Sequence, residues 1–209
     1  YFDENISLGH VRLSIIDLSE RARQPIWNED KSICIIYNGE IYNFQELRKR
    51  LQEKGHKFYS LSDTEVILHL YEEKGEKCVE DLNGIFAFAI YNRNKNELFL
   101  ARDRVGIKPL YYYFDGRKFI FSSEIKAILA HPVPRKVDKG SLSHYFKIFF
   151  VPAPFTLFEG IKKILPAHYL IFKGGQIIIE KYWDLEDLPE VKSEDEAMEG
   201  IKFLLRDSI

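Results

Sequence analysis

Residues 85–90 read Ile-Phe-Ala-Phe-Ala-Ile, and residues 33–36 read Ile-Cys-Ile-Ile. Both runs are short, almost wholly apolar, and rich in aromatic or β-branched side chains, which is typical of strands. A strand with one face in water alternates apolar and polar residues, and these two runs do not. We therefore expect two strands that are covered on both faces, as in a layered fold with helices outside.

Turn signals join neighbouring strands into hairpins along much of the chain. Asp115-Gly116 and Gly174-Gly175 each lie between two runs of β-forming residues, and a polar segment at 92–96 joins two more. Residues 32–37 predict another strand that runs into Asn38-Gly39, with 41–42 beginning the return strand. This pattern indicates antiparallel sheets rather than a series of parallel βαβ units.

Capping and stop residues mark five helices between these strands. They are expected over 43–55, from Ser62 or Asp63 to 75, over 124–130, over 141–146, and from 193 to Ile209. Asn43 with Glu46, and Ser193 with Glu196, have the spacing of capping boxes. The resulting fold class is α+β.

Composition excludes several classes of protein. With 30 basic and 32 acidic residues the net charge is −2, which gives no reason to expect a nucleic-acid or acidic-lipid partner. No apolar run approaches the ~20 residues that span a bilayer, and residues 1–5 lack the features of a signal peptide. We expect a soluble protein of the cytoplasm without a membrane partner.

The chain has two cysteines, Cys34 in an apolar run and Cys78 on an expected helix over 76–82. Free cysteine often behaves as a small buried hydrophobic residue, so we expect two buried, unpaired thiols. The six histidines show no metal-ligand spacing with each other or with cysteine. On this criterion no metal site is expected.

Asn38-Gly39 supports two compatible interpretations. Asn-Gly is the strongest sequence signal for a type I′ hairpin turn. The same turn can present the Asn38 side-chain NH2 and the Gly39 backbone N–H as two donors aimed at one oxygen, which is an oxyanion hole.

Three charged residues also have a structural and a functional interpretation. Arg12 can end a strand and pair with a surface acid, or it can clamp a substrate carboxylate through its planar guanidinium. Asp63 can serve the start of a helix and Glu40 can be a solvated turn residue. If both carboxylates face one pocket, they can instead bind an ammonium group.

Taken together, these segments resemble the glutaminase domain of class II glutamine amidotransferases, and within that family the branch of the glutamine-hydrolysing asparagine synthetases. The resemblance covers roughly residues 6–185, in the expected order. It rests on Gly9-His10-Val11-Arg12-Leu13-Ser14-Ile15-Ile16-Asp17, Tyr37-Asn38-Gly39-Glu40-Ile41-Tyr42-Asn43, Ser62-Asp63-Thr64-Glu65, 84–91, 101–111 and 122–127.

The resemblance implies an αββα sandwich of two antiparallel sheets, as in N-terminal-nucleophile hydrolases, and a function in hydrolysing glutamine to glutamate and ammonia. It assigns Arg12 to the glutamine α-carboxylate, Glu40 and Asp63 to the α-ammonium, and Asn38 and Gly39 to the oxyanion hole. The backbone of Leu13, Ser14, Ile15 and Ile16 is expected to line the carboxylate side.

The chain departs from the family at both ends. The family nucleophile is an N-terminal cysteine whose own α-amine acts as base, whereas this chain begins at Tyr1, so we expect a missing start and no turnover by these residues alone. Residues 1–185 are expected to form the glutaminase domain. Residues 186–209 would be a linker and the first helix of an absent synthetase domain, which would use ATP and Mg to convert aspartate to asparagine. No cofactor is expected in this chain, and a homodimer is retained as a candidate assembly.

Two alternatives remain open at this point. The chain could be an amidotransferase-like scaffold without a nucleophile, beside a different ligase. It could also belong to a class II amidotransferase with another acceptor. The complete set of five polar site residues argues against the scaffold, because a domain without chemistry has little need of them.

Overall fold

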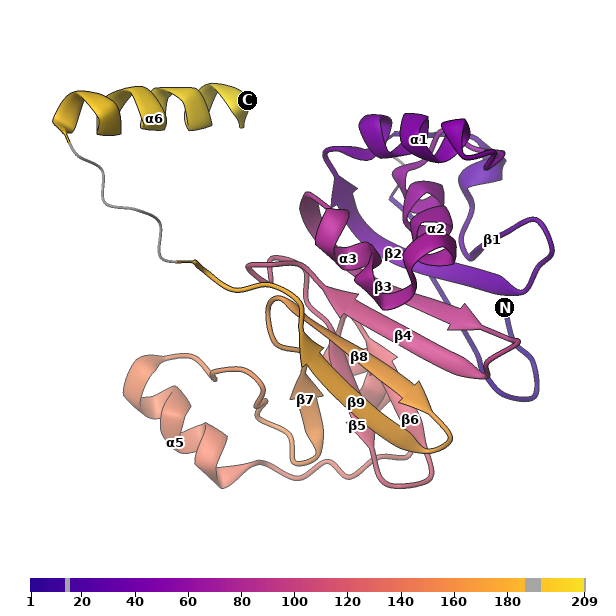
Figure 1. The fold of residues 1–209 in the computed structure, drawn as a ribbon. Coiled ribbons are helices and arrows are strands. Elements are labelled where there is room, and N and C mark those ends of the chain that lie inside the picture. Colours follow the sequence, from indigo (N-terminus) through magenta and orange to yellow (C-terminus); the bar gives the residue numbers. More distant parts are fainter. Residues whose placement is uncertain (14–15, 187–192, 209) are drawn as a thin grey trace.

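The computed structural model describes residues 1–13, 16–186 and 193–208. Its nine strands form two antiparallel sheets, in the orders β1-β2-β3-β4-β8-β9 and β6-β5-β7 (Figure 1). The strands of the larger sheet are β1 (Ile26–Trp27), β2 (Ile33–Ile41), β3 (Gly84–Asn92), β4 (Glu97–Arg102), β8 (His168–Lys173) and β9 (Gln176–Lys181). Those of the smaller sheet are β5 (Tyr111–Phe114), β6 (Phe119–Ser122) and β7 (Ile161–Lys163).

Six α-helices accompany the sheets in the described residues. They are α1 (Phe44–Glu53), α2 (Asp63–Lys74), α3 (Cys78–Asp81), α4 (Ile125–Leu129), α5 (Lys139–Ile148) and α6 (Glu194–Asp207). Short 3-10 turns lie at Glu20–Ala22 and Gly75–Lys77. No helix within the described ranges has the length and hydropathy needed to span a bilayer.

Three apolar clusters hold four layers together, which confirms the αββα sandwich. The first joins α1, α2 and α3 to one face of the larger sheet and includes Phe86, Phe88 and Phe99. The second lies between the two sheets and includes Leu100 and Tyr112. The third packs α4 against the outer face of the smaller sheet. The strands predicted to be covered on both faces, β2 and β3, are those between the first two clusters.

Local turn signals are confirmed where the chain reverses direction or a helix stops. The hairpins β5–β6 and β8–β9 turn at the predicted Asp115-Gly116 and Gly174-Gly175, and β3–β4 at the predicted polar segment. Gly55 and Gly75 follow α1 and α2 with φ of 99° and 60°, a region that glycine occupies without strain. Ser62 caps α2 by accepting the N–H of Thr64 at 3.2 Å.

The predicted hairpin turn at Asn38-Gly39 is wrong. β2 continues through both residues to Ile41 and pairs with β3 along its whole length, with Gly39 opposite Phe86. An alanine Cβ at Gly39 would lie 2.7 Å from the Phe86 Cα and closer still to the Ile85 carbonyl oxygen. Glycine is therefore required here by the approach of a neighbouring backbone, not by a turn.

The capping box at α1 is also wrong. Asn43 precedes the helix, but its side chain makes no cap; it donates to the Asp81 carbonyl at 2.9 Å and accepts from the Asn83 N–H at 3.0 Å. These bonds tie the end of β2 to the connection between α3 and β3. Asn43 satisfies distant backbone groups rather than those of its own helix, which no local spacing shows.

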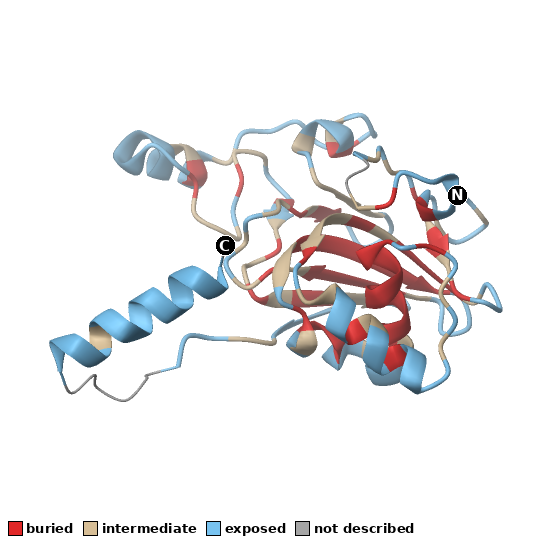
Figure 2. Cartoon of the chain, turned by 90° about the horizontal axis from the view of Figure 1, so that it is seen from above, coloured by how far each residue is buried: buried red, intermediate tan, exposed pale blue. Residues whose placement is uncertain are grey.

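Side-chain caps begin the last two helices, α5 and α6. α5 begins at Lys139, two residues earlier than predicted, because the Asp138 side chain caps it by accepting the Ser141 N–H at 2.6 Å. Ser193 caps α6 as predicted and accepts the Glu196 N–H at 3.2 Å. α6 ends at Asp207 with no buried residue, in contrast to the central strands β2, β3 and β4 of the larger sheet (Figure 2). The predicted continuation to Ile209 falls outside the described residues.

Candidate functional site

A cavity of about 1390 Å³ opens beside β2, between the N-terminal segment, β3 and β6. Its wall brings together residues that are up to 51 positions apart: Arg12, Asn38, Gly39, Glu40 and Asp63. Leu13 and Ile16 also line it, whereas Ser14 and Ile15 lie outside the described residues. The predicted site residues that the structure describes therefore share one cavity.

Strand alternation directs Asn38 and Glu40 into this cavity. Tyr37 belongs to the cluster under the helices, while Ile36 packs in the cluster between the sheets. Successive side chains of a strand point to opposite faces, so Asn38 and Glu40 share the face of Ile36. Within the described residues neither side chain makes a hydrogen bond, so both keep their polar groups available to a ligand.

The pairing of β2 also determines where the Gly39 N–H points. Phe86 is its partner on β3. The Phe86 carbonyl accepts the Asp103 N–H at 2.8 Å, and the Phe86 N–H donates to the Asp103 Oδ2 at 3.3 Å, so both backbone groups point toward the β4 side. Gly39 and Phe86 are therefore a pair without mutual hydrogen bonds, and the Gly39 N–H points away from β3. β1 pairs with β2 only at residues 34–35, so the edge of β2 is open beside Gly39.

Side chains occupy the two neighbouring donors on that open edge. The Tyr37 N–H donates to the Gln24 Oε1 at 2.6 Å, and the Ile41 N–H donates to the Asp63 Oδ2 at 3.0 Å. The Gly39 N–H lies between them and has no partner among the described residues. The turn was mispredicted, but a strand edge leaves a backbone donor free next to Asn38.

Asp63 is buried at the start of α2, where its carboxylate joins the helix to β2. Besides the Ile41 N–H, its Oδ2 accepts the Tyr37 hydroxyl at 2.7 Å. Burial, together with the adjacent Asp63 carboxylate, raises the pKa of Tyr37 far above its usual value, so the phenol stays a neutral donor. Among the described residues Oδ1 accepts only a long bond of 3.4 Å from Ser62, which leaves it with capacity for a cation.

Arg12 holds the loop that borders the cavity. Its guanidinium donates to the carbonyl oxygens of Asp17 and Ser19, rather than to a surface acid as the structural interpretation expected. The Asp17 carboxylate in turn accepts the N–H of Ser19 at 2.8 Å and that of Leu61 at 2.7 Å. Arg12 and residues 16–19 are thus tied to the connection that leads into α2 and Asp63.

Sequence reasoning missed His10, which lines the same cavity. Its Nδ1 is buried and makes no hydrogen bond within the described part of the chain. Burial lowers the pKa of His10, so the neutral imidazole is favoured. The sequence offered one signal for His10: it lies two residues before Arg12 in an alternating segment, so the two side chains are expected on the same side of the chain.

Both cysteines are free and buried, as predicted. Burial raises the pKa of Cys34 to about 12, and burial likewise raises that of Cys78. Cys34 packs between the sheets and Cys78 under the helices, and neither lines the cavity. Neither thiol has the exposure or the low pKa of a nucleophile.

The segment 102–108 is held together by hydrogen bonds from charged side chains to backbone groups. Arg102 donates to the carbonyl oxygens of Lys108, Ile164 and Gly106 at 2.6–2.7 Å, while Asp103 accepts N–H groups, including that of Ile107 at 2.9 Å. No salt bridge joins the two side chains in the described residues. Each charge satisfies backbone groups instead, so this segment is a structural support.

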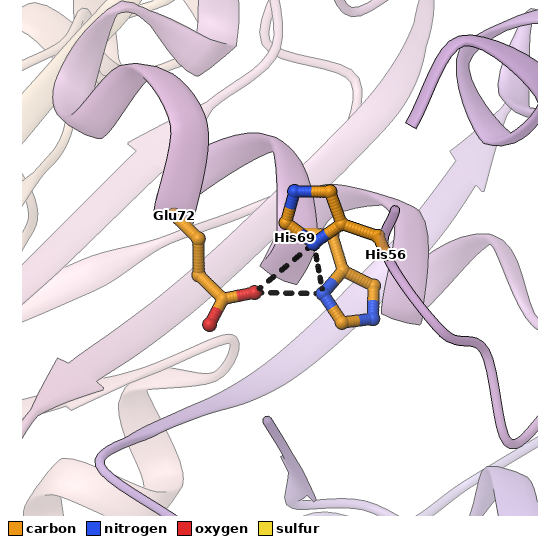
Figure 3. A group of neighbouring side chains, drawn as sticks. All are labelled: His56, His69 and Glu72. Carbon is orange, nitrogen blue, oxygen red and sulfur yellow. Dashed lines mark hydrogen bonds and ion pairs between the residues drawn. The ribbon is translucent and has the colours of Figure 1, made fainter. Parts of the chain in front are cut away.

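Outside the cavity, His56, His69 and Glu72 lie close enough to hold a metal ion (Figure 3). His56 precedes α2 and the other two residues are on it. The thirteen-residue separation of the histidines concealed this cluster from a spacing argument.

The chain is similar to known proteins along nearly its whole length. A family model described as "Glutamine amidotransferase domain" matches residues 1–183. "Asparagine synthetase [glutamine-hydrolyzing] 3" of Bacillus subtilis is 44% identical over 211 residues, covering 99% of this chain and 34% of that protein. "Putative asparagine synthetase [glutamine-hydrolyzing] 2" of Methanocaldococcus jannaschii is 40% identical, covering 98% and 43%. The chain thus spans between a third and a half of these relatives.

Among solved structures, a glutamine phosphoribosylpyrophosphate amidotransferase from B. subtilis superposes with a TM-score of 0.58. The alignment covers 83% of this chain and 34% of that one, at 22% identity. At this identity the likeness supports the sandwich fold alone.

Proposed function

The chain belongs to the glutamine amidotransferase domain family, and on that premise we propose that it binds glutamine in the cavity beside β2 and serves its hydrolysis to glutamate and ammonia. We propose further that the parent protein is a glutamine-hydrolysing asparagine synthetase. This second step rests on relatives at 39–44% identity that cover nearly all of the chain.

One observation carries the proposal: charges and donors suited to the three polar groups of glutamine line one cavity. Arg12 supplies the positive charge for an α-carboxylate, and Glu40 with Asp63 supplies the negative charge for an α-ammonium. Asn38 and the unpaired Gly39 N–H supply donors for the amide oxygen. When a nucleophile attacks the amide carbon, that oxygen gains negative charge, and preorganised donors stabilise it.

The attacking group in this proposal is a thiol from outside the 209 residues, since Cys34 and Cys78 are buried with raised pKa. An N-terminal cysteine can use its own amine as base. The chain alone would then bind glutamine weakly and not hydrolyse it. A synthetase domain in the same protein would use the ammonia, with ATP and Mg, to amidate aspartate. Free thiols are compatible with the cytoplasm as the compartment.

A scaffold without chemistry is less well supported. Asn38, Glu40 and the Gly39 N–H keep unsatisfied polar groups in the cavity, and a purely structural domain gains nothing from them. An amidotransferase with another acceptor uses the same glutamine site, so the acceptor is decided by the rest of the protein.

The test is ammonia release from glutamine by the full natural-length protein, supplied with aspartate and ATP. Asn38→Ala should lower kcat by about 10²–10³-fold, since that is the usual effect of losing one oxyanion donor. Asn94→Ala, in the exposed β3–β4 turn, is the matched control and should leave the rate unchanged. A folded protein that releases no ammonia, or an Asn38→Ala variant with wild-type kcat, would overturn the proposal.

A further inference from the structure

Three potential metal ligands converge on one point beside α2 (Figure 3). The two Nδ1 atoms of His56 and His69 are 3.2 Å apart. The Glu72 Oε2 is 2.7 Å from the His69 Nδ1 and 3.8 Å from the His56 Nδ1. His69 and Glu72 are three residues apart on one face of the helix, and His56 approaches from the connection before it.

These separations match those around a small divalent cation. Zinc lies about 2.0–2.2 Å from imidazole nitrogen and carboxylate oxygen, so in a tetrahedral site its ligand atoms are about 3.3–3.6 Å from each other. The nitrogen pair, at 3.2 Å, is about 0.1 Å below that range, and the nitrogen–oxygen pairs at 2.7 and 3.8 Å reach it with shifts of about 0.6 and 0.2 Å. Without a metal, one proton on the His69 Nδ1 is shared by Glu72 and the His56 lone pair in a three-centre hydrogen bond, whereas a cation would bind all three atoms directly.

The outward polar atoms of His56 and Glu72 have hydrogen-bond partners of the kind that support a metal ligand. The His56 Nε2 is 3.0 Å from the Glu73 Oε1, and the Glu72 Oε1 accepts the Asn28 Nδ2–H at 2.7 Å. The His69 Nε2 is buried without a hydrogen bond, with the Glu65 Oε1 at 3.8 Å. Metal-bound histidines usually donate their other N–H to a carboxylate, which fixes the tautomer and turns the free nitrogen to the metal.

We propose that His56, His69 and Glu72 form a binding site for Zn²⁺ or a similar first-row divalent cation. Two imidazoles and one carboxylate suit this class of cation, whereas Ca²⁺ and Mg²⁺ prefer oxygen ligands alone. The His56 and Glu72 side chains are 15% and 20% exposed, so water reaches the edge of the cluster and supplies the fourth ligand in this proposal. The site goes beyond the glutamine chemistry and revises the expectation that the chain has no metal site.

The metal has a structural role in this proposal. It links His56 to α2 and so closes the connection 54–62 onto the helix. That connection contains Leu61, whose N–H binds Asp17, and Ser62, which caps the helix at Asp63. A cation at the cluster therefore stabilises one wall of the glutamine cavity without touching the ligand.

The experiment counts zinc bound by the chelator-treated, full natural-length protein, using calorimetric titration and elemental analysis. The wild type should bind one zinc equivalent more than His56→Ala or Glu72→Gln. His144→Ala, an exposed histidine on α5, is the control and should keep that equivalent. Zn²⁺ should also raise the thermal midpoint of the wild type and the control but not of the two site variants.

Cobalt provides a second readout, because Co²⁺ at this site should give visible absorption bands that Glu72→Gln abolishes. Glu72→Gln keeps the shape of the side chain, so its folding can be checked by circular dichroism before titration. Equal zinc content in wild type and both site variants, or binding weaker than about 1 mM, would show that the cluster is only a hydrogen-bonded group. None of these measurements uses glutamine. A negative result would therefore reject the metal site and leave the proposed function intact, and loss of the proposed function would leave the metal site intact.

Discussion

We expect Gly39→Ala to destabilise the domain strongly, because the backbone of β3 occupies the space that a methyl group needs. The new Cβ would lie 2.7 Å from the Phe86 Cα, about 0.7 Å short of the 3.4 Å at which ordinary contact begins. The Ile85 carbonyl is nearer still. Both obstacles are backbone atoms of a central strand, so no side-chain rotation relieves the clash.

The cost follows from what must move. Displacing Phe86 disturbs a side chain that is 1% exposed in the core, and such overpacking costs about 1–3 kcal/mol. It also strains the two hydrogen bonds between Phe86 and Asp103, each contributing about 0.5–1.5 kcal/mol. Since alanine also stiffens the unfolded chain, which offsets about 0.4–1 kcal/mol, we expect a net loss of about 1–5 kcal/mol.

Urea unfolding of the 209-residue chain measures this loss. Gly9→Ala is the matched control, because Gly9 lines the same cavity but has no atom within 4 Å of the added Cβ. Its free energy of unfolding should stay within about 0.5 kcal/mol of wild type. A Gly39→Ala variant as stable as Gly9→Ala would refute the argument that β3 excludes a side chain at this position.

Three further outcomes are expected. Tyr37→Phe removes the buried bond to Asp63 and should lower the free energy of unfolding by about 1–3 kcal/mol, and an unchanged urea midpoint would contradict this. Hydrogen bonds from Ser19 and Leu61 lower the pKa of Asp17, so its stabilisation is present above pH 3.8 and lost as the pH falls through the lowered value. The stability difference between wild type and Asp17→Asn should therefore be large at pH 7 and shrink below pH 3.8; a constant difference would rule this out. Iodoacetamide at pH 8 should label Cys34 and Cys78 only in denaturant, as seen by mass spectrometry, and rapid labelling of the native chain would disprove their burial.

Elements with a local cause were predictable from the sequence. The hairpins at Asp115-Gly116 and Gly174-Gly175 need glycine at positive φ, and the chain places it there. The helix stop at Gly75 and the cap at Ser62 depend on bonds to the nearest residues. Such signals act within a few positions, so all the interacting groups lie in one short stretch of sequence.

Predictions failed where a residue serves a distant partner. Asn38-Gly39 has the composition of a turn, but glycine is also needed where another backbone approaches, and only the pairing with Phe86 distinguishes the two. Asn43 was assigned to its own helix and instead binds the backbone at Asp81 and Asn83. Glycine at 39 and asparagine at 43 correctly indicated that the backbone is restricted at these positions, but the groups that restrict it lie about 40 residues away in the sequence.

The sequence by itself determined the layered α+β class, the burial of both thiols, and the polar residue types that suit glutamine. Alternation, apolar runs and capping chemistry act locally and leave a record in residue order. Only the tertiary structure decided that Arg12, Glu40 and Asp63 share a cavity, that the Gly39 N–H faces an open strand edge, and that His56 meets His69 and Glu72. These outcomes depend on strand register and on how far apart elements pack, and residue spacing does not encode those distances.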